Sequence, residues 1–209
     1  MSSFETQDLR LARGRSTRAQ LLAAATDVLR QRGYAGTSMR AVADRAGVQL
    51  SLVHYHFGSK QRLLVAVLEN LTDSLLARQR TLFADDRPFS EQWRAACEHL
   101  REDIRSGYVR ILWELWAAGL ADDELAEEWR RTQAGWRRLI EERLERWQAE
   151  AHDELPLRPR ALATLIGNLF EGTQVEMLAG VAEDDAPHME ALEAVAALIA
   201  RLETRVRRR

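Results

Sequence analysis

The sequence is short of the residues on which cross-linked and metal-bound folds depend. One cysteine, Cys97, stands among its 209 residues, so an internal disulfide framework is excluded. We expect Cys97 to be a small buried residue of a helix. The closest pair among the five histidines, His54 and His56, is two residues apart and would point to different faces of a helix. The sequence therefore predicts no metal site and no cofactor.

Long apolar runs are also missing. No stretch reaches the roughly 18 apolar residues of a membrane span, and the first residues do not have the pattern of a signal peptide, so we expect a cytoplasmic protein. There is no glycine-rich phosphate loop and no Ser/His/Asp arrangement, and we predict no catalytic residues and no enzyme.

Alternation of apolar and polar residues, the mark of a strand, is absent over any useful length, whereas Ala, Leu, Glu and Arg dominate. The sequence predicts an all-α fold of about nine helices. We expect them at 16 or 17 to 32, 39–46, 51–57, 59–83, 90–105, 108–118, 122–151, 160–180 and 188–206.

Charge divides the chain unevenly. Residues 1–64 hold ten Lys or Arg against four Asp or Glu, whereas the remainder holds twenty against 28. A basic end on an acidic body suits the binding of a polyanion such as DNA. We expect a flexible arm at 1–12, a basic three-helix domain at 13–60 that would bind DNA, and a larger, acidic helical bundle at 61–209.

The segment 37–57 predicts two short helices that meet at Gly47. Glycine at the turn permits a positive φ, and Ala43 lets the two helices approach closely. An inner apolar surface would come from Val42, Ala46, Val48 and Val53. The outer surface of the second helix would carry groups suited to base edges and phosphates: Gln49, Ser51, His54 and Tyr55.

This part of the chain, about residues 14–68, resembles the tetracycline-repressor (TetR) family of bacterial regulators. The resemblance rests on Gly33-Tyr34, on Thr37-Ser38-Met39-Arg40-Ala41-Val42-Ala43, on Ala46-Gly47-Val48, and on Tyr55-His56-Phe57-Gly58-Ser59-Lys60. The remainder matches the family only in size and helical layout.

The resemblance implies roles for individual residues. Thr37 or Ser38 would bind a phosphate at a helix N-terminus, Tyr55 and Lys60 would contact the DNA backbone, and Arg40 would reach a phosphate. The variable positions that would face the bases are Gln49, Leu50, Ser51 and His54. His54 equally suits a solvated surface, and Arg13, Arg15 and Arg18 suit either DNA or a solvated arm.

Three positions depart from the family pattern. Gln49 stands where the family often has serine and is a poorer helix cap. Leu50 and Leu52 replace polar residues, although Leu50 could contact a thymine methyl. We therefore expect fewer direct base contacts.

Apolar stripes on the last two helices predict a homodimer. The last helix carries Leu192, Val195, Ile199, Leu202 and Val206, and the preceding one carries Leu162, Leu165, Ile166, Leu169 and Phe170. Helices 160–180 and 188–206 of two subunits would form a four-helix interface, unless the stripes only pack within one subunit. Two recognition helices about 34 Å apart would then bind double-stranded DNA with a roughly palindromic operator.

All six tryptophans lie in the C-terminal body. Trp129, Trp136 and Trp147 share a helix face with Leu125 and Ile140, which is typical of a core stripe. Trp113 and Trp116 flank Glu114 on a helix that lines the effector cavity in related regulators. The candidate pocket residues are Trp93, Tyr108, Leu112, Trp113, Trp116, Trp136, Asn168, Phe170, Glu171 and Gln174.

Together these features favour a DNA-binding transcriptional regulator, a repressor that a small-molecule effector releases from its operator. Two alternatives stay open at this point. The body could bind a partner protein instead of a small molecule, or the protein could activate transcription.

Overall fold

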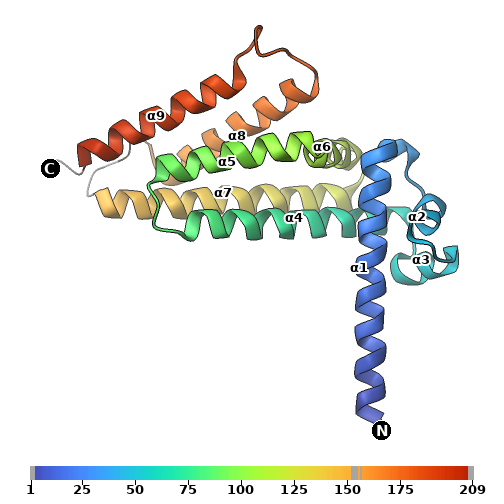
Figure 1. Cartoon of the computed structure of the whole chain (residues 1–209). Coiled ribbons are helices and arrows are strands. Elements are labelled where there is room, and N and C mark those ends of the chain that lie inside the picture. Colours follow the sequence, from blue (N-terminus) through green and yellow to red (C-terminus); the bar gives the residue numbers. More distant parts are fainter. Residues whose placement is uncertain (1–2, 152–154, 156, 207–209) are drawn as a thin grey trace. The chain divides into compact units, whose positions relative to one another are not determined.

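The computed structural model describes the backbone of residues 3–151, 155 and 157–206, and the side chains of residues 14–150, 155 and 157–204. These residues form nine helices and no strands (Figure 1). The helices are α1 (Ser3–Gly36), α2 (Met39–Ala46), α3 (Leu50–Phe57), α4 (Lys60–Ala84), α5 (Phe89–Arg105), α6 (Tyr108–Gly119), α7 (Asp123–Ala151), α8 (Pro159–Leu178) and α9 (His188–Val206). None of the described helices has the length and apolar character to cross a membrane.

The all-α prediction is confirmed, and from α2 onward the helices begin and end within about two residues of the predicted positions. The first helix differs, because it begins at Ser3 rather than at Ser16 or Thr17. Residues 4–13 contain no proline or glycine, so nothing in their backbone stops the helix from extending toward the N-terminus. Gly33, with φ 67° and ψ −178°, interrupts α1 where the sequence predicted its end.

Packing divides the chain into two compact units. Unit 1 comprises residues 1–71 and 110–129, and unit 2 comprises residues 72–109 and 130–209. The borders fall within α4, α6 and α7. Unit 1 thus contains the predicted DNA-binding domain together with the first half of α4, most of α6 and the start of α7.

The core of unit 1 is built where α1, α2, α3 and the start of α4 meet. Leu29, Val42, Val53 and Leu63 are fully buried there. Two polar links join α1 to α2: the Gln20 amide donates to the Ala46 carbonyl at 3.0 Å, and an ion pair joins Asp27 and Arg45. Because two short helices cannot bury a core alone, α1 supplies the missing apolar surface.

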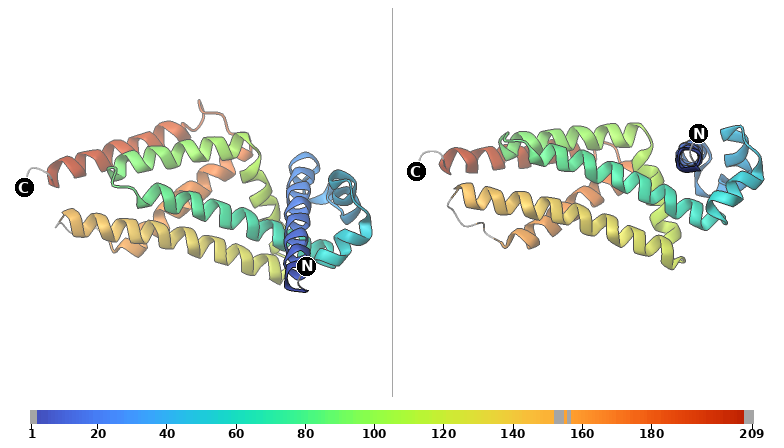
Figure 2. Two further views of the ribbon diagram at one scale, coloured as in Figure 1. Left: turned by 60° about the horizontal axis from the view of Figure 1, so that its bottom comes forward. Right: turned by 90° about the horizontal axis from the view of Figure 1, so that it is seen from below.

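Unit 2 is a bundle of long helices, seen from two further directions in Figure 2. Helices α5 and α9 lie alongside each other, and they are joined by a hydrogen bond of 2.9 Å from the Trp93 indole to the Leu192 carbonyl. The second half of α4 lies against α7, where the Thr72 and Thr132 hydroxyls are 2.7 Å apart. A Cβ on Gly135 would lie 2.7 Å from the Leu76 Cδ1, so this glycine permits the close approach of the two helices.

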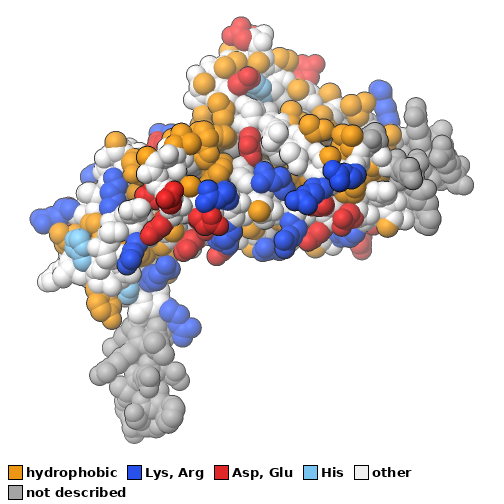
Figure 3. Space-filling view, turned by 180° about the vertical axis from the view of Figure 1, so that it is seen from behind, with side chains coloured by type: hydrophobic (Ala, Val, Ile, Leu, Met, Phe, Trp, Pro, Cys, Tyr) orange, Lys and Arg blue, Asp and Glu red, His pale blue; other side chains and the backbone are white. Residues whose placement is uncertain are grey.

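The predicted stripes on α8 and α9 combine two kinds of residue. Leu192 and Phe170 are buried within the chain, whereas Leu165, Leu169 and Leu202 are exposed. Leu198, outside the predicted stripe, is also exposed. The side chain of Val206 lies outside the described residues. Figure 3 shows hydrophobic side chains gathered on the surface of this part of unit 2. One face of each helix therefore packs inside the bundle, and a neighbouring apolar face stays uncovered.

Candidate nucleic-acid interface and effector site

The turn between α2 and α3 has the geometry that the sequence predicted. The Ser38 hydroxyl caps α2 by accepting a hydrogen bond from the Ala41 N–H at 3.1 Å. Gly47 ends α2 in the left-handed conformation, with φ 69° and ψ 32°, and the Val48 N–H donates back to the Ala43 carbonyl at 3.0 Å. These contacts fix the direction in which α3 leaves the turn.

The second short helix, α3, presents a polar face. Val53 and Phe57 are buried beneath it, whereas Gln49, Ser51 and His54 are exposed. The Tyr55 side chain is 82% exposed, an unusual position for so large a ring. Gln49 makes no side-chain cap, as expected from its departure from the family pattern. The predicted outward surface is thus confirmed as accessible groups on one short, well-anchored helix.

Two other predicted DNA contacts are engaged within the protein. Thr37 is 2% exposed, and its hydroxyl donates to the Gly33 carbonyl at 2.7 Å, so of the pair Thr37 and Ser38 only Ser38 is accessible. The Lys60 ammonium donates to the Tyr34 carbonyl at 3.1 Å and lies 4.6 Å from the centre of the Tyr34 ring. Lys60 therefore also holds the end of α1 against the start of α4.

The remaining predicted contacts differ in exposure. Arg40 is exposed and lies 3.8 Å from Asp44, a weak surface ion pair, whereas Leu50 is half-buried. A groove of about 380 Å³ runs beside α3 and α4 and is bordered by Arg18 and Arg62. The Arg18 guanidinium lies over the Phe57 ring, 5.4 Å from its centre. Arg62 was not among the predicted contacts, although it lies in the first turn of α4, where the Ser59 hydroxyl accepts a hydrogen bond from the Arg62 N–H at 3.2 Å.

At the break in α1, a residue of α6 supplies the missing hydrogen-bond partner. Because Gly33 leaves the helical conformation, the Tyr34 N–H loses its partner within the helix and donates instead to the Glu114 carboxylate at 2.5 Å. Arg110, one turn before Glu114 and 3.7 Å from it, donates to the Arg30 carbonyl. The carboxylate of Glu114, which lies in sequence between two predicted pocket tryptophans, thus caps the end of α1.

The tryptophans form two separate groups. In unit 1, the rings of Trp113, Trp116 and Trp129 lie 5.1–6.3 Å apart, and Leu112 is buried. In unit 2, the Phe170 ring lies 5.4 Å from Trp93 and 6.1 Å from Trp136. The predicted pocket residues are thus divided between the two units.

Polar candidates for the pocket vary in burial. Glu171 is half-buried and accepts a hydrogen bond from Gln133, and burial raises the pKa of its carboxyl group. Burial likewise raises the pKa of Tyr108 far above its ordinary value. Gln174 is half-buried, whereas Asn168 is exposed.

Two grooves are hollowed into unit 2. One, of about 600 Å³, lies between α4 and α7 and is lined by Arg80, Phe83, Ala84, Leu139, Glu142, Glu145, Arg146 and Ala149. The other, of about 500 Å³, lies between α4 and α5 and is lined by Arg78, Thr81, Leu82, Asp85, Arg87, Ala95 and His99. Neither contains a residue that the sequence placed in the effector pocket.

Metal and thiol chemistry find no support at these sites. Across the described ranges, no three His, Cys, Asp or Glu side chains gather as metal ligands would. Cys97 is buried as expected, and burial raises the pKa of its thiol to about 12, which keeps it protonated and unreactive.

Comparison with known families identifies the N-terminal segment. The family model "Bacterial regulatory proteins, tetR family" matches residues 21–67. The transcriptional activator FasR of Mycolicibacterium smegmatis is 40% identical over 100 residues, 46% of this chain and 45% of its own. The regulator CymR of Pseudomonas putida is 31% identical over 130 residues, 62% of this chain and 64% of its own. This chain therefore spans less than two thirds of the length of either relative.

Solved structures extend the likeness to the whole fold. A transcriptional regulator from Rhodococcus sp. has a TM-score of 0.72 at 24% identity, over 88% of this chain and 96% of its own. FadR from Bacillus subtilis, solved in complex with stearoyl-CoA, has a TM-score of 0.69 at 16% identity, over 87% and 96%. At such identities the structures show a shared fold and nothing about ligands of this chain.

Proposed function

We propose that this chain, whose residues 21–67 match the TetR family model, is a TetR-family regulator that binds DNA sequence-specifically, a repressor released from its operator by a small molecule. One observation carries the proposal: the polar face of α3, with Tyr55 82% exposed above buried Val53 and Phe57. A gene regulator of this kind would act in the bacterial cytoplasm, with no catalytic residues and no cofactor.

The proposed DNA contacts follow from exposure and charge. Gln49, Ser51 and His54 would face base edges, and Tyr55 would bind the backbone. Ser38 at the start of α2, together with Arg40 and Lys60, would bind phosphates. For Lys60 this requires the ammonium to share its donors between the Tyr34 carbonyl and a phosphate, which its three N–H groups permit.

The exposed apolar faces of α8 and α9 support a homodimer. Leu165 and Leu198 are 55% and 57% exposed, a large apolar area for a surface without a function. A two-fold pair would present two α3 helices and select a roughly palindromic site.

For the effector, we propose a site in unit 2 around Trp93, Trp136, Phe170 and Glu171. Phe170 contacts both tryptophan rings, and Glu171, the next residue on α8, adds a half-buried carboxylate. A ligand that binds one arrangement of the dimer better than another would change operator affinity by shifting the population. Full release needs a preference of about 10⁴-fold.

Selection of bound sites from random DNA tests the proposal directly. We expect enrichment of a palindrome with half-sites about one helical turn apart. Lys60→Ala should weaken binding to all sequences and reduce the salt dependence by about one phosphate contact per subunit. Recovery of no enriched sequence by the wild-type protein would refute sequence-specific recognition.

A second candidate is activation rather than repression. The relative FasR is named an activator and is 40% identical over 100 residues. A reporter gene placed behind the selected operator distinguishes the two, because deletion of the regulator raises expression under repression and lowers it under activation.

A further inference from the structure

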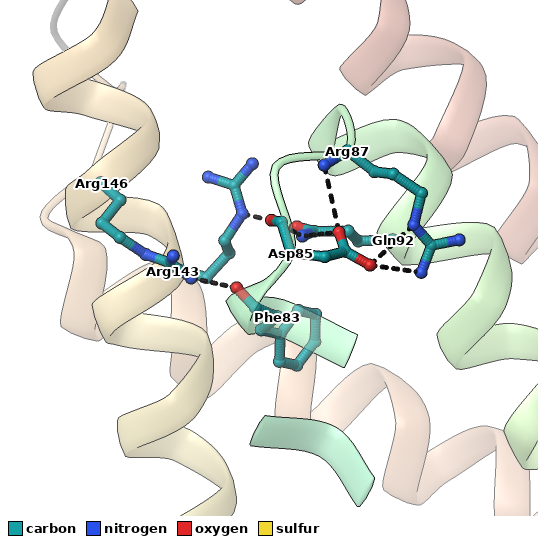
Figure 4. A network of polar contacts seen from close by, with 6 residues as sticks. All are labelled: Phe83, Asp85, Arg87, Gln92, Arg143 and Arg146. Atoms are coloured by element: carbon teal, nitrogen blue, oxygen red, sulfur yellow. Dashed lines mark hydrogen bonds and ion pairs between the residues drawn. The ribbon is translucent and has the colours of Figure 1, made fainter. Parts of the chain in front are cut away.

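The interior of unit 2 contains an arginine that no acid neutralises by direct contact. Arg143, on α7, is 5% exposed. Its Nε donates to the Gln92 amide oxygen at 2.6 Å, and its guanidinium lies 5.0 Å from the centre of the Phe89 ring. The Nη1 atom is buried and has no hydrogen-bond partner among the residues that the structure describes. Figure 4 shows this side chain reaching from α7 toward Gln92.

Three carboxylates attract the Arg143 guanidinium from a distance, Glu150, Glu203 and Asp85, and the last two are engaged in hydrogen bonds with other residues. Asp85 accepts hydrogen bonds from the Arg87 guanidinium at 2.7 Å and from the Gln92 amide at 2.9 Å. Glu203 accepts hydrogen bonds from the Ser90 hydroxyl at 2.6 Å and from its N–H at 3.2 Å. In the described part of unit 2, Arg143 therefore has a neutral amide and an aromatic ring as its recorded partners.

This arrangement costs stability as it stands. Burial lowers the pKa of Arg143, but a guanidinium remains charged at neutral pH. An unpaired N–H group in the interior loses its hydration without compensation, and the loss is greater for a charged group. Such a residue is expected where a ligand supplies the missing acceptor.

The surroundings favour an anion with an apolar body. Arg146 also reaches from α7 and donates to the Phe83 carbonyl, so the network in Figure 4 contains three arginines and one aspartate. Next to the guanidinium, Phe89 begins a series of aromatic contacts that continues through Trp93 to Phe170. The 600 Å³ groove between α4 and α7 shares Phe83 and Arg146 with the network.

From this geometry we infer that the effector of unit 2 is an amphipathic organic acid whose carboxylate or phosphate binds Arg143 and whose apolar part lies among the rings of Phe89, Trp93 and Phe170. The inference rests on the proposed effector-responsive function and adds the chemical class of the effector. Because the rings contact one another in this structure, the ligand must displace at least one of them, which couples binding to a change in packing.

Thermal unfolding of the full-length protein with matched acid and amide probes tests the inference. The pairs are octanoate with octanamide and phenylacetate with phenylacetamide, at equal ionic strength. We expect the acids to raise the unfolding midpoint more than their amides. Arg143→Met should weaken acid binding by at least about tenfold, the value of one charge-assisted hydrogen bond, whereas Arg138→Met, an exposed control on the same helix, should not.

Further measurements distinguish a carboxylate effector from a phosphate effector and test the role of the arginine. Phenyl phosphate acting more strongly than phenylacetate assigns a phosphate effector, and the reverse assigns a carboxylate. Inorganic phosphate alone acting as strongly as phenyl phosphate would overturn the place given to the aromatic rings. Without probes, Arg143→Met should unfold at the wild-type temperature or above, because a buried unpaired charge is removed.

Three results overturn the acid site: equal effects of acid and amide on the wild type, an acid effect that survives in Arg143→Met, or a clearly lower unfolding temperature of that variant without probes. These outcomes are independent of DNA selection. A protein that binds the acids through Arg143 yet enriches no DNA sequence would retain the site and lose the proposed regulator function.

Discussion

The two units of this protein satisfy their polar groups in different ways. In unit 1 the backbone groups at helix ends have side-chain partners, as where Ser38 caps α2 and Glu114 caps the end of α1. In unit 2 several buried polar atoms have no hydrogen-bond partner within the described ranges, among them Arg143 Nη1, Gln79 Oε1 and His99 Nδ1. A domain whose polar groups all have hydrogen-bond partners can hold a surface in a fixed shape. Buried polar groups that lack partners are instead typical of a site that a ligand completes.

The same contrast appears in the aromatic residues. The tryptophans of unit 1 cluster with one another on α6 and the start of α7. In unit 2, Trp93 and Trp136 meet phenylalanines beside a polar network. We infer that specificity for DNA lies on the outside of unit 1, and specificity for the effector lies on the inside of unit 2.

The largest expected effect tests whether the exposed face of α3 depends on its buried one. Val53→Asp places a carboxylate at a fully buried position and should destabilise unit 1 by at least about 4 kcal/mol, with loss of DNA binding. Ser51→Asp, on the exposed side of the same helix, should change stability by less than about 0.5 kcal/mol and still weaken DNA binding by charge repulsion.

Urea unfolding followed by circular dichroism, together with operator binding, measures both properties. Tight operator binding by Ser51→Asp would remove α3 from the interface. An unchanged unfolding midpoint for Val53→Asp would show that this side chain does not hold α3.

A smaller effect separates the two faces of α9. Leu192 is fully buried under Trp93, and Leu192→Ala should cost about 3 kcal/mol in the stability of unit 2. Leu198, 57% exposed, should behave differently, because Leu198→Ala removes apolar area that only a partner subunit would cover. We expect weaker dimerisation with little change in the fold of each subunit.

Sedimentation equilibrium measures the dimer, and thermal unfolding at low protein concentration measures the subunit. If Leu198→Ala left the dimer constant unchanged while Leu192→Ala abolished it, the interface would not lie on the exposed face of α9.

The helix-turn-helix was predictable because its signals are local. The turn glycine Gly47 and the inward-facing Val42 and Val53 lie within about a dozen residues of one another, and the structure bears out the predicted places of all three. Sequence periodicity also found α8 and α9, but it placed Leu192 and Leu202 on one stripe. A helix that packs on both sides has two adjacent apolar faces, and a single period cannot tell which one the chain itself covers.

Other features depended on contacts distant in sequence. Lys60 was predicted for a phosphate, and its bond to the Tyr34 carbonyl joins residues 26 apart. The Glu114 cap of Tyr34 spans 80 residues. Arg143 was not singled out at all, because one arginine in a helix rich in charged residues looks solvated until the burial of its neighbours is known. Local patterns in a single sequence do not reveal which residues far apart along the chain will contact each other.

The smallest effect expected concerns pH and the charge network of unit 2. Hydrogen bonds from the Arg87 and Gln92 side chains hold the pKa of Asp85 down, at about 2 against an ordinary 3.8. A carboxyl group with a lowered folded-state pKa contributes stability above about pH 4 and loses it as pH falls toward 2. Asp85→Asn keeps an oxygen that can accept from Gln92 but removes the charge that Arg87 binds.

We therefore expect this variant to be slightly less stable than the wild type at neutral pH, with the difference shrinking between pH 4 and pH 2. Asp86→Asn, the exposed neighbour, is the control and should show no such narrowing. Urea midpoints at a series of pH values provide the measurement, and a gap between Asp85→Asn and the wild type that stays constant with pH would contradict the expectation. Asp85 binds Arg87 and Gln92, and Gln92 accepts a hydrogen bond from Arg143. If the stability difference shrinks as predicted, the negative charge of Asp85 is already used by Arg87. Arg143 then needs an acid from outside the protein to neutralise its charge.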